Sequence, residues 1–428
     1  MRQFIWQRWS QALAVAGLLA ALVGLAAPGL LGAALAQEPL TLTFWHYWDG
    51  VNGDTLDRLA QEYNAQHPGV VVEPVFIPNP ELLSKLQTAI ASGDTPALAI
   101  ADVIWMAALK RSGGLAPLDS FITASGLDLS DFYASQLDFD RFEGQLYALP
   151  VSTNNLELFY NKDLFRAAGL DPERPPQTWD ELVEFGQRIR QADPSKFGYE
   201  LFTQGGEGTT WQFQVFLWQL GGEFLTPDGQ PAFDSPAGVQ ALQFWSDLIR
   251  TYQVSALRPW GLFGSGDAAM VMDGSWMVQF FPPQINFELG TARFPIPSGG
   301  QPATNMGGEH IFILKGDPAR EQAAFDFIQY FTSTAVQVQW DQATGFTPVR
   351  RSVAEDPGYQ AWLRDTQPLL IPFVESQQYA RARPSVPQYP EISAAFSRQV
   401  ERVLQGQATP EEALAQAAAD VRAILAGP

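Results

Sequence analysis

The chain of 428 residues contains no cysteine. This absence excludes a disulfide framework, thiol catalysis and any metal site with cysteine ligands. It also excludes a lipid anchor attached to an N-terminal cysteine. An exported protein without this anchor is expected to be soluble outside the inner membrane, and a periplasm is the simplest place to retain it.

Basic residues and histidines are also few. Lys and Arg number 26 against 46 Asp and Glu, which gives a formal net charge of -20. Because contacts to nucleic-acid phosphates need a basic patch, the sequence predicts no nucleic-acid partner. The three histidines are His46, His67 and His310, and none has a second histidine at a metal-ligand spacing. We therefore expect no metal site and no cofactor.

Signatures of catalysis are lacking. Gly264-Ser265-Gly266 is too short for a nucleophile elbow. The glycine-rich segment 204–210 has no Lys before its Thr pair, so it is not a phosphate-binding P-loop. It is either a flexible loop or a helix start whose backbone amides touch a ligand. Paired carboxylates for glycoside hydrolysis stay open among 46 acids, so a secreted glycan-active enzyme is the less favoured alternative to a non-catalytic protein.

Only one long hydrophobic run is present, and it lies at the N-terminus. Arg2 and Arg8 precede an apolar stretch at residues 12–36, which ends in Ala34-Leu35-Ala36. This order is typical of a secretory signal peptide, here residues 1–36, cleaved after about Ala36. The run is long enough to cross a bilayer, so an uncleaved anchor is the alternative.

Short apolar runs alternate with amphipathic segments through the rest of the chain. Strands are predicted at residues 40–44, 70–77, 97–105, 156–160 and 311–314. Helices are predicted at residues 54–66, 81–91, 210–220, 237–252 and 318–333. Two more are predicted after capping boxes, one at 178–181 that opens a helix to about residue 192, and one at 409–412. This alternation predicts α/β lobes, each with a mainly parallel sheet.

Aromatic residues are abundant, at 12 % of the chain with 13 Trp. Aromatic planes stack on the apolar faces of sugars, while Asp, Asn and Arg satisfy the sugar hydroxyls. Several tryptophans fall near a predicted loop or helix start, where core packing is the alternative for each ring: Trp45, Trp48, Trp105, Trp211, Trp260 and Trp276.

Several segments together resemble the extracellular solute-binding proteins of the maltose and glycerol-3-phosphate type. The resemblance runs in order from residue 42 to the end of the chain. It is carried by residues 158–172 (L-F-Y-N-K-D-L…), 175–182, 266–276, 307–308, 344–349 (T-G-F-T-P-V), 383–393 and 409–414.

The resemblance implies two α/β lobes of the type II periplasmic-binding-protein fold, joined by crossover segments that act as a hinge. By analogy, residues 37–148 plus 293–345 form the first lobe, and residues 149–292 plus 346–428 form the second. Such a protein is a monomer that binds a small molecule between its lobes. It delivers the ligand to an ABC-transporter permease in the inner membrane.

The resemblance also implies ligand-binding positions. In the stretch T-F-W-H-Y-W-D-G (43–50), we expect His46 and Trp48 to face the ligand, because alternate residues of an extended chain share one side. The full predicted set is His46, Trp48, Asp49, Asp102, Trp105, Asn154, Trp211, Trp260, Trp276, Gly307, Gly308, Phe346 and Arg383.

The predicted ligand is a mono- to oligosaccharide or a polyol. Glycerol-3-phosphate or a glycerophosphodiester is the alternative, because binders of these compounds resemble the chain near its C-terminus. However, Pro80 and Pro390 stand where those binders carry an aromatic residue and an Arg, and Phe346 stands where they carry a Tyr. A phosphate needs a strong cation or a helix N-terminus, so the loss of the Arg favours a sugar.

Overall fold

The structure is a computed structural model that describes residues 38–202 and 205–427. The predicted signal peptide and its cleavage site lie outside these residues. In the described part, no helix is both long enough and apolar enough to cross a bilayer.

The strands form sheets of five, three, two and two members. Their bounds are β1 (Leu40–His46), β2 (Val70–Phe76), β3 (Leu98–Asp102), β4 (Arg141–Phe142), β5 (Gln145–Leu146), β6 (Ala148–Pro150), β7 (Leu156–Asn161), β8 (Met270–Gly274), β9 (Leu289–Ala292), β10 (Thr304–Met306), β11 (Glu309–Ile313) and β12 (Ala380–Ala382).

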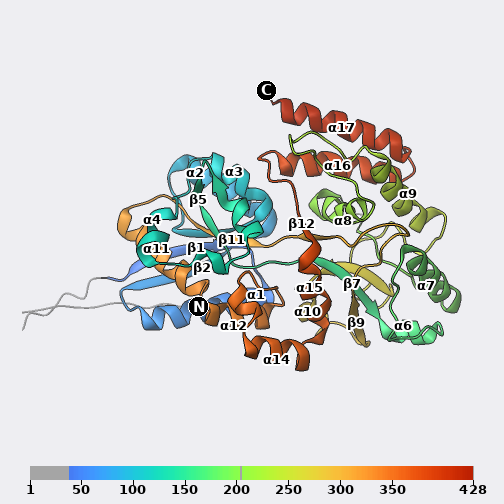
Figure 1. Ribbon diagram of the computed structural model, residues 1–428, viewed down its shortest axis with the longest axis horizontal. Coiled ribbons are helices and arrows are strands. Elements are labelled where there is room, and N and C mark those ends of the chain that lie inside the picture. Colours follow the sequence, from blue (N-terminus) through green and yellow to red (C-terminus); the bar gives the residue numbers. More distant parts are fainter. Residues whose placement is uncertain (1–37, 203–204, 428) are drawn as a thin grey trace, which may run out of the picture. The chain divides into compact units, whose positions relative to one another are not determined.

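Helices occupy most of the remaining chain (Figure 1). Those before β8 are α1 (Gly50–Gln66), α2 (Asn79–Ser92), α3 (Met106–Arg111), α4 (Asp119–Ser125), α5 (Ala134–Leu137), α6 (Lys162–Ala167), α7 (Trp179–Ala192), α8 (Gly206–Gln219) and α9 (Pro236–Arg250). Those after β8 are α10 (Met277–Phe280), α11 (Pro318–Phe331), α12 (Thr334–Thr344), α13 (Arg351–Ala354), α14 (Pro357–Asp365), α15 (Ile371–Ser376), α16 (Tyr389–Leu404) and α17 (Pro410–Ala426). The 3-10 helices are η1 (Val103–Trp105), η2 (Leu129–Asp131), η3 (Asp138–Asp140), η4 (Pro368–Leu370) and η5 (Gln377–Tyr379).

The five-stranded sheet has the order β2-β1-β3-β11-β6 and forms the centre of the first lobe. Its side chains alternate between two covered faces. Leu98 and Ile100 pack with α1 and α11, while Ala99 and Ala101 pack with α2 and α3. Burial on both faces explains why β3 has a nearly continuous apolar sequence.

The three-stranded sheet has the order β8-β7-β9 and forms the centre of the second lobe. Leu158 faces the core shared with α7 and α8, whereas Phe159 faces a cluster that includes residues of α14 and α15. Around this core, α16 packs against α17 and α8, and α9 contacts the same group (Figure 1).

In each of the two larger sheets, one strand runs against the others. β11 is antiparallel to β3 and β6, and β7 is antiparallel to β8 and β9, while the remaining strands of each sheet share one direction. β11 and β7 are the strands by which the chain enters a lobe after a crossover, so they start at the sheet edge where the others end. Glu309 of β11 therefore pairs with Asp102 of β3, and Leu156 of β7 pairs with Gly274 of β8.

The predicted two-lobed α/β fold with mainly parallel sheets is confirmed. Both predicted helix N-caps form as well. At α17 the capping box is complete, with Thr409 and Glu412 each bonding the other's backbone amide. At α7 only half of it forms: Thr178 accepts from the Glu181 amide, but the Glu181 carboxylate accepts from the Gln177 amide at 2.7 Å.

The crossover segments are held to one another by backbone hydrogen bonds. The Asn154 amide donates to the Gly307 carbonyl at 3.2 Å, and the Gly307 amide donates to the Asn154 carbonyl at 2.9 Å. The Thr347 amide donates to the Thr153 carbonyl at 2.9 Å. Gly308 makes the close approach possible. Its φ is +136°, and a Cβ there would lie 2.1 Å from the Ser152 carbonyl oxygen. Only glycine fits both conditions.

We predict that Gly308→Ala lowers the free energy of unfolding by about 2–3 kcal/mol, because it adds backbone strain and a clash with the first crossover. Urea denaturation measures the change. Gly69→Ala is the matched control, because a Cβ added there would meet no neighbouring atom within 4 Å and its φ is not positive. Equal stability of the two variants would contradict this account of the crossover.

Candidate functional site

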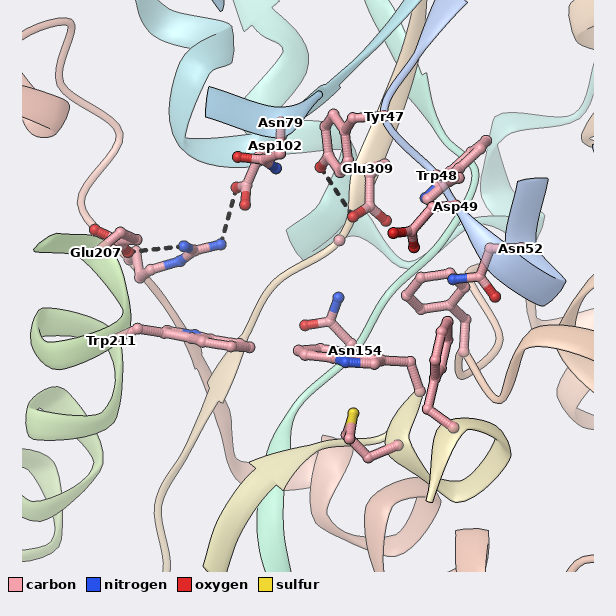
Figure 2. Close-up of a pocket in the computed structure, with 16 residues that line it drawn as sticks. Tyr47, Trp48, Asp49, Asn52, Asn79, Asp102, Asn154, Glu207, Trp211 and Glu309 are labelled. Atoms are coloured by element: carbon pink, nitrogen blue, oxygen red, sulfur yellow. Dashed lines mark hydrogen bonds and ion pairs between the residues drawn. The ribbon is translucent and has the colours of Figure 1, made fainter. Parts of the chain in front are cut away.

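A cavity of about 380 Å³ lies where the carboxyl ends of the parallel strands meet the crossovers. Its size is within the range of small-molecule sites, and the ends of parallel strands are where α/β proteins place their ligands. The walls come from the loop after β1, the end of β3, the crossovers, and the helices α8 and α10 (Figure 2).

Arg383 occupies one side of the cavity and is 4 % exposed. Its guanidinium donates to Asp102 at 3.0 Å and to Glu207 at 2.8 Å, as the dashed lines in Figure 2 show. Burial opposes the charge of Arg383, but the two carboxylates outweigh it and raise the pKa of the guanidinium. The Arg383 guanidinium carbon also lies 5.4 Å from the centroid of the Trp211 ring, a cation–π contact.

Glu207 is fixed by more than this ion pair. It lies in the first turn of α8, where a carboxylate is favourable to the helix dipole. Its oxygens accept from Ser393 at 2.5 Å and from Tyr389 at 3.2 Å. Burial raises the pKa of Glu207, an effect that Arg383 partly offsets. Asp102 is held in turn by the Ile104 amide, which donates to it at 3.0 Å.

Glu309 is a buried acidic residue on another part of the cavity wall. Its carboxylate accepts from the Tyr47 hydroxyl at 2.9 Å, as Figure 2 shows. It also accepts from the Ser152 hydroxyl. Burial raises the pKa of Glu309 to about 7, and the nearby carboxylate of Asp102 adds to the rise. Near neutral pH this carboxyl therefore exists in both protonation states.

Two tryptophans give the cavity an aromatic surface. The rings of Trp211 and Trp276 are parallel within 6°, with centroids 5.7 Å apart. Trp211 comes from α8, and Trp276 follows β8 in the sequence G-S-W. A Cβ at Gly274 would fall 2.0 Å from the Trp276 ring, so the glycine of this motif leaves room for the ring to lie across the backbone.

Several buried polar atoms at the cavity have no hydrogen-bond partner among the described residues. Such atoms are uncommon in folded proteins and are expected where a ligand or ordered water completes the bonding. They are Trp48 Nε1, Asn52 Oδ1, Asn154 Oδ1, Trp211 Nε1 and Arg383 Nε.

Most of the predicted site residues line this one cavity. They are Trp48, Asp49, Asp102, Asn154, Trp211, Trp276, Gly308, Phe346 and Arg383. Gly307 lies directly behind them: a Cβ there would be 2.5 Å from Asn154 Oδ1 and 3.2 Å from Arg383 Nη2.

His46, Trp105 and Trp260 are predicted site residues that the structure places away from the cavity lining. β1 continues to His46, so the alternation that buries Phe44 also turns His46 into the core of the first lobe, where burial lowers its pKa to about 4. Trp105 is buried and packs edge-on against Tyr47, with centroids 5.7 Å apart. Trp260 packs against Phe202 beside a separate hollow.

The same alternation determines which aromatic side chains of residues 45–48 face the core of the first lobe. Trp48 shares the core side with His46, is 3 % exposed and packs on Trp340 with centroids 4.6 Å apart, so only part of it reaches the cavity. Tyr47, on the opposite side, points to Glu309.

Other lining residues were missing from the prediction: Tyr47, Asn52, Asn79, Glu207, Met277, Phe280 and Glu309. Two of them had a signal in the sequence. Glu207 lies in the glycine-rich segment before α8, and Glu309 directly follows the Gly-Gly pair. The segment supplies a side chain to the cavity, whereas the sequence offered either a flexible loop or a contact through backbone amides.

Two α/β lobes with a polar and aromatic cavity at their crossovers define a two-lobed ligand-binding protein. Residues 47–338 match the model of the family described as bacterial extracellular solute-binding protein. The chain belongs to this family, and the resemblance found in the sequence is confirmed.

The descriptions of individual relatives name different ligands. A cyclic α-maltosyl-1,6-maltose binding protein from Arthrobacter globiformis is 41 % identical, with a TM-score of 0.82 over 91 % of this chain and 100 % of that one. A solute-binding protein from Thermotoga lettingae, solved with α-D-tagatose, is 30 % identical, with a TM-score of 0.79 over 90 % and 100 %. The sn-glycerol-3-phosphate-binding periplasmic protein UgpB of Pectobacterium atrosepticum is 26 % identical over 418 residues, covering 91 % of this chain and 92 % of that protein.

We predict that Arg383→Lys lowers the free energy of unfolding by about 2 kcal/mol, because an ammonium group cannot replace the forked contacts to two carboxylates. Arg381→Lys is the matched control. Arg381 pairs with Glu223 at 2.6 Å nearer the surface, where such pairs contribute about 0–1 kcal/mol. Urea denaturation of both variants measures the difference, and similar losses would contradict a special role for the Arg383 cluster.

Proposed function

We propose that this protein binds a neutral carbohydrate, an oligosaccharide in particular, in the cavity and delivers it to an ABC-transporter permease. The observation that carries the proposal is the parallel pair Trp211 and Trp276 beside a row of hydrogen-bonding carboxylates. Two adjacent indoles offer apolar stacking surface for more than one sugar ring, and the carboxylates accept hydrogen bonds from hydroxyls.

The charge of the cavity favours a neutral ligand over a phosphate ester. Its lining includes Asp49, Asp102, Glu207 and Glu309, and among the described lining residues Arg383 is the one cation. That cation is already paired with two carboxylates. Like charges 5 Å apart repel by about 3 kcal/mol at an effective dielectric constant near 20, so each unpaired carboxylate opposes an anionic ligand.

The comparisons point the same way without deciding the ligand. The 41 % identical relative is named for a cyclic oligosaccharide, and the 30 % identical one was solved with a monosaccharide. Glycerol-3-phosphate, named for the 26 % identical relative, is the second candidate. Glycerol-3-phosphate is supported by the overall likeness to this relative and by the N-terminus of α8 at the cavity, which is a favourable place for an anion. However, Glu207 already occupies that position, so a ligand anion would have to displace its carboxylate.

Hinge closure of the lobes is part of the proposal. We place the first lobe at residues 37–148 plus 293–345 and the second at 149–292 plus 346–428. The five-stranded sheet falls almost wholly within the first set, and the β8-β7-β9 sheet falls within the second. The packing of α14 and α15 on Phe159 supports the assignment of the C-terminal part to the second lobe.

We further propose that the protein acts as a monomer in the periplasm and has no catalytic activity. The predicted signal peptide and the word periplasmic in the name of the UgpB relative support the location. The relatives named above are binding proteins, which supports a role in capture and delivery without catalysis.

Titration of tryptophan fluorescence tests the proposal. The panel contains maltose, maltotriose, cyclic α-maltosyl-1,6-maltose, a polyol, and sn-glycerol-3-phosphate. We expect saturable changes with at least one oligosaccharide, because Trp211 and Trp276 line the cavity. A response to the phosphate ester and to no sugar would overturn the carbohydrate assignment.

Trp276→Ala is expected to weaken binding of the best sugar at least about tenfold, because it removes both the apolar area that the ring buries against the sugar and a stacking contribution of about 0.5–1.5 kcal/mol beyond that area. Trp260→Ala is the control, since Trp260 packs against Phe202 outside the cavity. It should leave the dissociation constant within about twofold. If both variants bind like the unmodified protein, Trp276 does not hold the sugar.

A further inference from the structure

Glu309 is unusual among the cavity carboxylates because it directly follows a crossover, as the first residue of β11, and is itself buried. It is 7 % exposed yet lines the cavity. Its backbone carbonyl accepts from the amides of Val151 and Ser152 at 3.0 and 3.3 Å. Its amide donates to the Ser152 hydroxyl at 3.0 Å, and that hydroxyl donates back to the carboxylate. Glu309 thus connects the cavity to both crossovers that meet there.

The groups facing Glu309 are mostly acidic or neutral. Tyr47, from the loop after β1, donates its hydroxyl to the carboxylate at 2.9 Å. Asp102, at the end of β3, is near enough to raise the pKa of Glu309, whereas the next residue, His310, lowers it slightly. His310 points to the other side of β11, where it is buried with Asp140 at 2.6 Å.

The remaining charges of the cavity do not neutralise Glu309. Arg383 donates to Asp102 and Glu207, and Asp49 adds a further carboxylate to the lining. A charged Glu309 therefore lies in an acidic, poorly hydrated position, where its protonated form is favoured by burial and by the neighbouring charge.

We propose that Glu309 contacts a sugar hydroxyl and takes up a proton from solvent as the sugar displaces water, so that ligand affinity rises as the pH falls through neutrality. This inference rests on the proposed function. The protonated carboxyl can donate a hydrogen bond to a sugar oxygen, and the uncharged form no longer repels Asp102.

The sign of the pH dependence follows from linkage. The pKa of Glu309 without ligand is about 7, and its causes are burial first and Asp102 among the others. A sugar that replaces the cavity water increases the desolvation and moves this pKa further upward. A group whose pKa rises on binding stabilises the complex at low pH and loses that effect as the pH rises through the two pKa values. A rise of about one unit corresponds to binding about sevenfold tighter at pH 6 than at pH 8.5.

Isothermal titration calorimetry of the mature protein tests the proposal with cyclic α-maltosyl-1,6-maltose or maltotriose, whichever binds tighter. We expect the unmodified protein to bind several-fold tighter at pH 6 than at pH 8.5. Titrations at pH 7.5 in phosphate and in Tris should give different apparent enthalpies, because proton uptake draws on the buffer. Glu309→Gln should remove both effects, since the amide cannot titrate.

Asp273→Asn is the matched control. Asp273 is also a buried carboxyl, with a pKa raised to about 7 by burial, but it does not line the cavity. Its variant should keep the pH dependence of the unmodified protein. Circular dichroism melting of both variants at each pH checks that the folded fraction is unchanged.

The outcomes separate the two proposals. If no sugar binds at any pH, the carbohydrate assignment fails. If a sugar binds but its affinity does not vary between pH 6 and 8.5, or varies equally with Glu309→Gln, the role of Glu309 is overturned. Loss of the pH dependence in Asp273→Asn alone would also overturn it, by assigning the titration to Asp273.

Discussion

The buried double ion pair of Arg383 is the interaction on which the site depends. It joins Asp102, where β3 of the first lobe ends, to Glu207, in the first turn of α8 in the second lobe. A buried guanidinium is tolerated only when its charge is matched, and removal of one partner typically costs about 3–5 kcal/mol. The residues around it are positioned accordingly: the Trp211 ring contacts the cation, and Ser393 and Tyr389 hold Glu207 in place.

The crossovers explain why polar side chains from distant parts of the sequence meet here. The strand that enters each lobe runs antiparallel to its neighbours, so its first residues lie beside the last residues of the parallel strands. Asp102 and Glu309 are separated in the sequence by the whole segment 149–292 and are nevertheless partners in register. A cavity at this edge is therefore a consequence of the topology, and the glycine at 308 allows the segments to pass closely enough to enclose it.

Much of this arrangement could be predicted from local sequence patterns. Periodicity located β1, β2, β3, β7 and β11, and caps such as Thr178 and Thr409 located helix starts. Within the aromatic run at residues 45–48, however, the side chains that face the cavity depend on where β1 ends. The strand reaches His46, and two more residues in the same alternation put Trp48 against Trp340. The position of Trp340 relative to β1 is a tertiary fact that no local pattern contains.

Glu207 and Glu309 were missed for a related reason. Each is one acid among 46, and its significance comes from burial and from partners far along the chain, such as Ser393 and Ser152. The Gly-Gly pair at 307–308 and the glycine-rich segment at 204–210 indicated a close approach of the backbone to a neighbouring segment or a ligand. They did not indicate which side chain beside them would line the cavity. Identification of such residues from sequence would require knowledge of the crossover contacts.

The ligand class that we propose rests on local charge and not on overall likeness. Of the relatives that cover nearly the full length of the chain, one is named for a cyclic oligosaccharide, one was solved with α-D-tagatose and one is named for a phosphate ester. The shared fold therefore accommodates ligands of different charge. In this chain the lining carboxylates leave no uncommitted cation among the described cavity residues, whereas a phosphate would need one. A neutral, hydroxyl-rich ligand needs only acceptors and an aromatic surface, and the cavity presents both in Glu309, Asp102 and the Trp211–Trp276 pair.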